Sequence, residues 1–226
     1  MRKVIVYPAS HVYFDGVISA VNSALANANV DEIWIMTDGE PFPYKVPFNV
    51  HILDVSCQQW VKRDSPNWRN EYAYICLVRV ALAKIFPDLD MILSLDADTI
   101  ITQDISELWD LNMDGYYLAG VPEPKLSAQH RRPYINMGMG LFNLKAIRGE
   151  GLDDEMIDRI NHRWYQWVEQ DCINSVLEEG IKPLPSIYND CQFTEPCDNA
   201  KILHFAYTFD WKDYSIVKQY REGQNT

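Results

Sequence analysis

Two aspartates stand directly after a short apolar run. Residues Met91–Leu95 are apolar at four positions of five, and Asp96 and Asp98 follow them with a single alanine between. Two carboxylates at the end of a buried strand repel one another unless a proton or a divalent cation lies between them. Carboxylate oxygens suit Mg²⁺ and Mn²⁺, and both ions bind phosphate. The pattern therefore indicates a metal site for a phosphorylated ligand, although acids at strand ends also serve as turn and cap residues.

The segments before these aspartates predict a parallel sheet. Extended runs occur at Lys3–Tyr7, Glu32–Met36 and Asn49–Val55. A helical pattern from Phe14 to about Asn29 separates the first two runs, and this order with short links is typical of right-handed crossovers between parallel strands. Ligands of such sheets bind beyond the carboxyl ends of the strands. Ala9, Ser10 and Tyr13 would then lie on the same side as the two aspartates.

The rest of the chain continues the α/β pattern. Further strands are expected at Tyr116–Val121, Ile135–Leu144, Ile181–Leu184 and Lys201–Phe205, and helices at Asn70–Phe86, Asp153–Ile160 and Gln166–Glu179. Gly138 and Gly140 interrupt an apolar strand and suggest that a ligand or another strand approaches the backbone closely. Arg79 stands beside an apolar helix face, where an arginine is usually a surface residue.

One segment is basic in an otherwise acidic chain. Pro122–Pro133 is expected to be a loop, and it carries Lys125, His130, Arg131 and Arg132. A ligand-facing lid and a solvated surface loop both fit this composition.

Length and composition predict one globular domain over residues 1–226. The formal net charge of −12 argues against a nucleic-acid or anionic-membrane surface, because such surfaces are basic. No apolar run approaches the ~18–20 residues of a membrane span, and the N-terminal apolar run is too short for a signal peptide. The five cysteines form no Cys-x-x-Cys pair, so free thiols are expected in a reduced, cytoplasmic protein.

The two aspartates admit two enzymatic interpretations. An apolar strand, an Asp-x-Asp and the nearby Thr99 also describe the nucleophile strand of haloacid-dehalogenase-like phosphatases, which hold Mg²⁺. Such phosphatases need a later acidic pair after its own apolar strand. The pair Asp153 and Asp154 follows Gly149-Glu-Gly-Leu152 instead.

The order of motifs resembles glycosyltransferase family 8, whose members are retaining sugar transferases with a GT-A fold. The resemblance runs through Tyr7–Tyr13, Leu77–Arg79, Met91–Thr102, Ile135–Leu144, Glu169–Asn174, Pro183–Asn189 and Ile202–His204. It implies a Rossmann-like α/β fold with a mostly parallel sheet flanked by helices and a small additional antiparallel element.

The resemblance also implies roles for single residues. Asp96, Asp98 and His204 would hold Mn²⁺ or Mg²⁺ on the diphosphate of a nucleotide sugar such as UDP-glucose or UDP-galactose. Gln170 and Asp171 would be catalytic, either in front-face transfer or, for Asp171, through a covalent intermediate. The remaining donor-binding residues would be Ala9, Tyr13, Arg79, Ala97, Asn136 and Lys212. The acceptor stays open between a glycan, a protein and a small molecule, and a non-catalytic nucleotide-sugar-binding protein is a further alternative.

Overall fold

The computed structural model describes residues 1–68, 74–208 and 210–222. A seven-stranded sheet with the order β3-β2-β1-β4-β7-β6-β8 forms its centre. The strands are β1 (Val4–Pro8), β2 (Glu32–Thr37), β3 (Val50–Asp54), β4 (Met91–Leu95), β6 (Leu118–Pro122), β7 (Ile135–Asn143) and β8 (Ile181–Pro183). Only β7 runs antiparallel to its neighbours β4 and β6, while the other neighbouring strands of this sheet are parallel. The mostly parallel sheet expected from the sequence is confirmed.

Both faces of the central strands β1, β4 and β7 are buried, which explains why these strands are apolar without alternation. Successive residues of a strand point to opposite faces. In β1, Val4 and Val6 enter one apolar core, whereas Ile5 and Tyr7 enter the other. Four consecutive buried residues therefore fill two separate cores.

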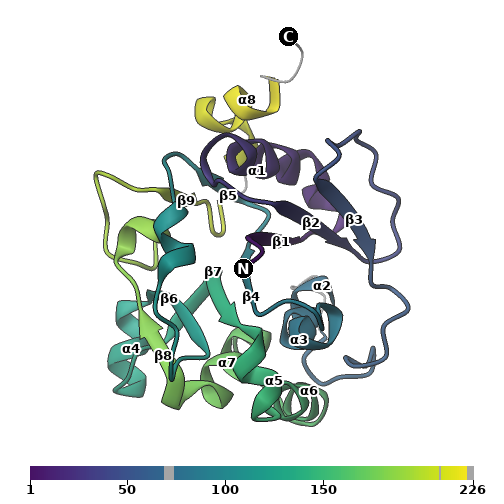
Figure 1. Ribbon diagram of the computed structural model, residues 1–226, viewed down its shortest axis with the longest axis vertical. Coiled ribbons are helices and arrows are strands. Elements are labelled where there is room, and N and C mark those ends of the chain that lie inside the picture. The colour runs from purple at the N-terminus through teal and green to yellow at the C-terminus, as the bar shows by residue number, and fades with distance from the viewer. Residues whose placement is uncertain (69–73, 209, 223–226) are drawn as a thin grey trace.

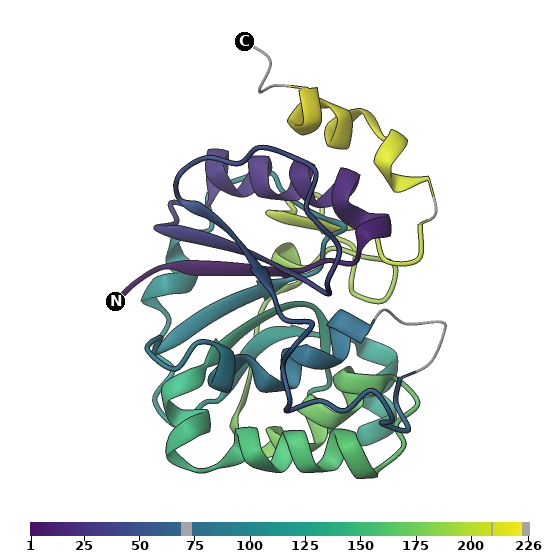
Figure 2. The same cartoon turned by 90° about the vertical axis from the view of Figure 1, so that its right-hand side faces the viewer.

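Helices cover the two faces unequally (Figure 2). On one face lie α1 (Phe14–Asn27) and, beyond it, α8 (Ser215–Glu222). The other face is covered by α2 (Tyr74–Leu77), α3 (Leu82–Ile85), α5 (Leu144–Gly149), α6 (Leu152–His162) and α7 (Val168–Val176). The remaining α-helix, α4 (Pro124–His130), lies beside the β6–β8 edge (Figure 1). Among the described residues, no helix has the length and apolar character needed to cross a membrane.

Two expected elements differ from the structure. The helix expected over Asn70–Phe86 has its first residues, 70–73, outside the described part of the chain, and its remainder is divided by a 3-10 turn over Val78–Ala81. The expectation of a loop over Pro122–Pro133 is wrong, because α4 occupies most of it. Pro124 stands at its first turn, where a proline loses no hydrogen bond, and Arg131 ends it in the left-handed conformation, with φ of 57°.

A second, two-stranded sheet joins distant parts of the chain. It pairs β5 (Thr99–Ile101) with β9 (Ile202–His204) in antiparallel register. Thr99 lies opposite His204, so the pairing brings the histidine to the residue after Asp98. This is the small antiparallel element expected from the sequence.

Candidate active site

Asp96, Asp98 and His204 form a compact cluster where β4 ends. His204 Nε2 lies 3.4 Å from Asp98 Oδ1 and 3.7 Å from Asp96 Oδ2. One possible ligand atom from each residue lies within 4.8 Å of the other two. Two carboxylate oxygens and an imidazole nitrogen are a donor set that suits a divalent cation, and Mn²⁺ accepts both kinds of ligand. The three residues therefore fit the metal site that the sequence predicts.

The protonation of His204 agrees with this fit. Burial alone would lower the pKa of His204, but Asp98 and then Asp96 raise it well above its ordinary value. Without a cation, the two acids thus hold a proton on the imidazole. A divalent cation would replace that proton as the positive charge between the carboxylates.

Gly138 of β7 makes room for the imidazole. A Cβ atom at this position would lie 2.1 Å from His204 Cε1 and 2.2 Å from Nδ1, closer than two such atoms can approach. The close approach expected at this glycine is therefore that of a side chain on β9. The backbone carbonyl of Gly138 also accepts a hydrogen bond from the Asp96 amide at 3.0 Å, which ties the first aspartate to β7.

Arg79 lies beneath the cluster and is 2% exposed, so its interpretation as a surface residue is wrong. Its guanidinium donates to the Met137 carbonyl at 2.6 Å and to Asp96. Nη1 also lies 3.7 Å from Glu169 Oε1. Burial raises the pKa of Glu169 to about 7, although Arg79 acts to lower it. A buried positive charge thus faces two carboxyls, of which only Asp96 is strongly paired.

Gln170 and Asp171 lie in the first turn of α7 but have different surroundings. Gln170 Oε1 accepts a hydrogen bond from the Met137 amide at 2.9 Å, and Nε2 donates to the Tyr134 hydroxyl at 3.4 Å. Gln170 also lines the cavity described below. Asp171 accepts hydrogen bonds from the Tyr134 hydroxyl and from the Trp167 amide, the latter at 2.9 Å. The carboxylate of Asp171 is thus engaged by Tyr134 and Trp167 and does not line the cavity.

A cavity of about 620 Å³ opens over these residues. The expected site residues on its wall are Tyr13, Arg79, Asp96, Ala97, Asp98, Asn136, Gln170, His204 and Lys212. Ala9 is not among them, because it is buried and its amide donates to the Met36 carbonyl at 2.9 Å. The flanking Pro8 and Ser10 line the cavity instead.

Lys212 brings the C-terminal segment to the part of the cavity wall that contains Tyr13. Its ammonium donates to the Val12 carbonyl at 2.7 Å and lies 6.0 Å from the centre of the Tyr13 ring. An aromatic ring and a cation therefore lie close together. Such a ring can stack on a nucleotide base, and such a cation can pair with a phosphate.

The sequence did not single out several polar residues of the site, among them Glu123 and Asn189. Glu123 lines the cavity and is 8% exposed, and burial raises its pKa. It directly follows β6 just as Asp96 follows β4, so its place at a strand end was an available signal. Asn189 is fully buried behind His204. No helix or strand pattern in the sequence begins after Asn189. Only its place in Pro183–Asn189, a range that resembles the family, pointed to the site.

The acidic pair required by a phosphatase lies elsewhere. Asp153 and Asp154 pair with Lys84 at 3.1 and 2.8 Å. Neither carboxyl lines the cavity. The arrangement gives no support to the interpretation as a haloacid-dehalogenase-like phosphatase.

Comparisons with known proteins agree with this geometry. A model of glycosyl transferase family 8 matches residues 4–208. Glycosyltransferase GlyA of Streptococcus pneumoniae is 23% identical over 98% of this chain and 34% of its own length. Probable galacturonosyltransferase 13 of Arabidopsis thaliana is 42% identical over 50% of this chain and 24% of its own length. The chain thus spans about a third or less of these two curated relatives.

A solved structure extends the comparison to the fold. The galactosyltransferase LgtC, in complex with donor and acceptor sugar analogues, has a TM-score of 0.77 at 16% sequence identity. The match covers 99% of this chain and 96% of that chain. The two chains therefore share the GT-A fold that the sequence predicts.

Proposed function

This chain belongs to glycosyl transferase family 8, and from that premise we propose that it is a retaining hexosyltransferase with a nucleotide-sugar donor. UDP-glucose and UDP-galactose are the proposed donors. One observation carries the proposal: the cluster of Asp96, Asp98 and His204 shares a single cavity with Gln170. A site for a cation on a diphosphate and a neutral amide for the sugar then face the same space.

Mn²⁺ or Mg²⁺ is the proposed cofactor, held by Asp96, Asp98 and His204. When bound, such a cation would stabilise the negative charge of the departing nucleoside diphosphate. Arg79 holds Asp96 in place from below, through an ion pair that is closed to solvent on the arginine side. Tyr13 and Lys212 bind the nucleotide, and Asn136 binds hydroxyls of the sugar.

The surroundings of Gln170 and Asp171 favour front-face transfer. Gln170 offers a neutral amide, which cannot form a stable covalent glycosyl ester. Asp171 is engaged by Tyr134 and Trp167. We therefore propose that the acceptor hydroxyl attacks the sugar from the side of the departing diphosphate and gives its proton to a diphosphate oxygen. Asp171 acts by orienting the start of α7.

We further propose that residues 1–226 act as one transferase domain. The first and last helices pack together, since Asn22 Nδ2 donates to the Tyr220 carbonyl at 2.8 Å. The acceptor class is left to experiment: a glycan, a protein and a small molecule are each compatible with the open cavity.

A thermal-shift panel tests the donor. Tm is measured with UDP, GDP, UDP-glucose and UDP-galactose, each with and without Mn²⁺, because a ligand that binds only the folded state stabilises it. We expect a Mn²⁺-dependent rise with uridine nucleotides, and no such rise in Asp98→Asn, which should still fold.

Hydrolysis of the donor in the absence of acceptor then separates a transferase from a binding protein. A shift without any hydrolysis or transfer would favour a non-catalytic nucleotide-sugar-binding protein. No shift with any nucleotide would contradict the proposed donor.

A further inference from the structure

A chain of hydrogen bonds runs behind the cation site from His204 to Glu123. His204 Nδ1 lies 3.0 Å from Asn189 Oδ1, and Asn189 Nδ2 donates to Asn136 Oδ1 at 3.0 Å. Asn136 Oδ1 also accepts from the Gly138 amide at 3.0 Å. Asn136 Nδ2 lies 3.5 Å from Glu123 Oε2. A residue of the metal site and a residue of the sugar site are thus joined through one buried amide.

The direction of every bond in this chain follows from a single backbone group. The Gly138 N–H can only donate, so the atom of Asn136 that faces it must be the carbonyl oxygen. Asn189 must then present its NH₂ group to that oxygen, and its own Oδ1 is left to accept from His204. Nδ1 of His204 therefore carries a hydrogen, and Nε2, which faces Asp96 and Asp98, is the nitrogen whose proton a cation would replace.

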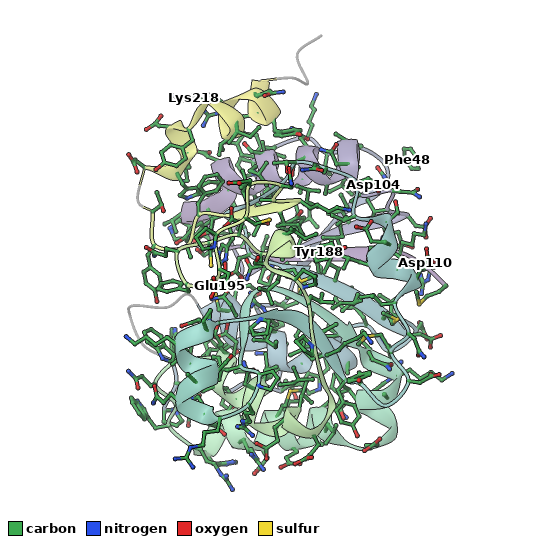
Figure 3. All side chains as sticks on the ribbon, turned by 90° about the vertical axis from the view of Figure 1, so that its left-hand side faces the viewer. Phe48, Asp104, Asp110, Tyr188, Glu195 and Lys218 are labelled. Atoms are coloured by element: carbon green, nitrogen blue, oxygen red, sulfur yellow. The ribbon has the colours of Figure 1, made fainter. Side chains whose placement is uncertain are left out.

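Asn189 is held in this position by its backbone as well as by its side chain. It is fully buried, and its carbonyl accepts from Thr194 Oγ1 at 2.8 Å. The amide of Asp190 donates to the Ile202 carbonyl, and the His204 amide donates to the Asp190 carbonyl, both at 2.9 Å. The turn before it is fixed by Tyr188, labelled in Figure 3, whose hydroxyl donates to Glu107 Oε1 at 2.7 Å. The backbone next to Asn189 is therefore hydrogen-bonded to β9, and this fixes the point from which its side chain reaches His204.

We propose that Asn189 is a positioning residue with two functions. It selects the tautomer of His204 whose Nε2 can bind a cation, and it orients Asn136 so that its NH₂ group points toward the donor sugar and Glu123. The inference rests on the proposed function, because it takes Asp96, Asp98 and His204 as the cation site. Hydrogen-bonding partners of this kind orient a ligating histidine and raise its basicity.

The first arm of the test is the Mn²⁺ affinity of Asn189→Ala. Electron paramagnetic resonance of free Mn²⁺ gives the Kd without any turnover. We expect an increase of about tenfold or more, the usual effect of removing such a partner. Asn143→Ala is the control. It removes three side-chain hydrogen bonds, with Met113, Tyr116 and Ala146, at the opposite end of β7, whereas Asn189→Ala removes two. An unchanged Kd in Asn189→Ala would overturn the proposal.

The second arm separates the two functions of the side chain. Asn189→Asp keeps an acceptor for His204 Nδ1–H but removes the donor to Asn136. We expect Mn²⁺ to bind at least as tightly as in the wild type, while the Kd of UDP-glucose rises about fivefold, as for the loss of one hydrogen bond. The Kd of UDP, which lacks the sugar, should not change. Equal losses for UDP and UDP-glucose would contradict the link to Asn136.

The third arm reads the histidine directly. In protein labelled with ¹⁵N-histidine, the His204 Nδ1–H should give a slowly exchanging signal with or without Mg²⁺, and Asn189→Ala should lose it. This signal does not depend on sugar transfer. If the wild type bound no nucleotide, the proposed function would be refuted, but the signal would still test the tautomer of His204. Absence of the signal in the folded wild type would overturn the inference. Should Asn189→Ala not fold, Asn189→Asp and this spectrum decide it.

Discussion

Gly138 leaves the space that the imidazole of His204 occupies. Its role can be tested by a substitution that changes none of the proposed cation ligands. A Cβ atom there would overlap the imidazole. Gly138→Ala should therefore push the ring away from Asp96 and Asp98 and weaken Mn²⁺ binding about tenfold or more, the size of effect seen when a ligand is misplaced. The measurement is a Mn²⁺ binding isotherm beside the Tm.

Gly149→Ala is the control for this change. A Cβ atom at Gly149 would meet no atom within 4 Å, and the residue ends α5. Its Tm should stay the same or rise, because alanine restricts the unfolded chain, and its Mn²⁺ affinity should match the wild type. If Gly138→Ala and Gly149→Ala bound Mn²⁺ with equal affinity, Gly138 would not be needed to position the imidazole of His204.

Gln170 and Asp171 are adjacent, yet the structure predicts different kinetics for their variants. Gln170→Ala should lower kcat about tenfold or more, a loss of ~1.4 kcal/mol in transition-state stabilisation, with a smaller change in KM. Asp171→Asn keeps an oxygen that accepts from the Trp167 amide, and its NH₂ group can donate to the Tyr134 hydroxyl, so it should retain most of its activity. Removal of a true nucleophile costs roughly 10⁶-fold. Such a loss in Asp171→Asn, with the fold intact, would point to a covalent intermediate and against front-face transfer.

At the scale of elements, α7 carries a buried acid into the base of the site. Glu169 is 6% exposed, and its Oε2 has no hydrogen-bond partner among the described residues. Burial raises its pKa to about 7 from the ordinary glutamate value of 4.5, so the folded state binds this proton more tightly than the unfolded state. Its contribution to stability is therefore fully present below about pH 4.5 and is lost as the pH rises through about 7.

Glu169→Gln tests this sign, because glutamine keeps the shape and never ionises. The free energy of unfolding of the wild type, relative to Glu169→Gln, should fall by about 3 kcal/mol between pH 4.5 and pH 8. Chemical denaturation at a series of pH values measures it. Parallel pH profiles for the two proteins would show that Arg79 compensates the charge of Glu169 fully.

The elements also show what the sequence could predict and what it could not. Strands with an apolar run and an acid at the end, such as β4 with Asp96, were predictable because burial on both faces leaves a continuous signal. The meeting of Asp98 with His204 depends on β5 and β9, which have three residues each. Strands this short carry no periodicity, so only the resemblance to a family pointed to the contact.

Three helices, α4, α5 and α8, were not predicted from the sequence. In α4 the basic residues gave the impression of a solvated loop, although Pro124 at the first turn and Leu126, which is 8% exposed, were signals of a short helix. For α8 no expectation was made, and its place depends on packing against α1. The role of Asn189 could not be predicted from the sequence for a similar reason, because its hydrogen-bond partners lie 15 and 53 positions away.

At the scale of the whole molecule, α1 and α8 pack together although they lie far apart in the sequence. Asn27 Nδ2 of α1 donates to the Tyr220 hydroxyl of α8 at 2.9 Å, and Figures 2 and 3 show α8 lying over α1, with Lys218 at its outer side. The segment between β9 and α8 contributes Ala206 and Lys212 to the cavity wall. Nucleotide binding should therefore depend on how firmly this C-terminal segment is anchored to α1.

Gly16 and Trp211 form that anchor. Trp211 is 3% exposed, and a Cβ atom at Gly16 would lie 2.2 Å from its Cη2 atom. Gly16→Ala should therefore displace the ring, lower the free energy of unfolding by about 1–3 kcal/mol as overpacking does, and weaken UDP binding by moving the neighbouring Lys212. Because the effect requires the indole, Gly16→Ala should cost much less in a Trp211→Leu background. A double-mutant cycle of Tm and UDP affinity measures this coupling, and additive effects would mean that the C-terminal segment is held elsewhere.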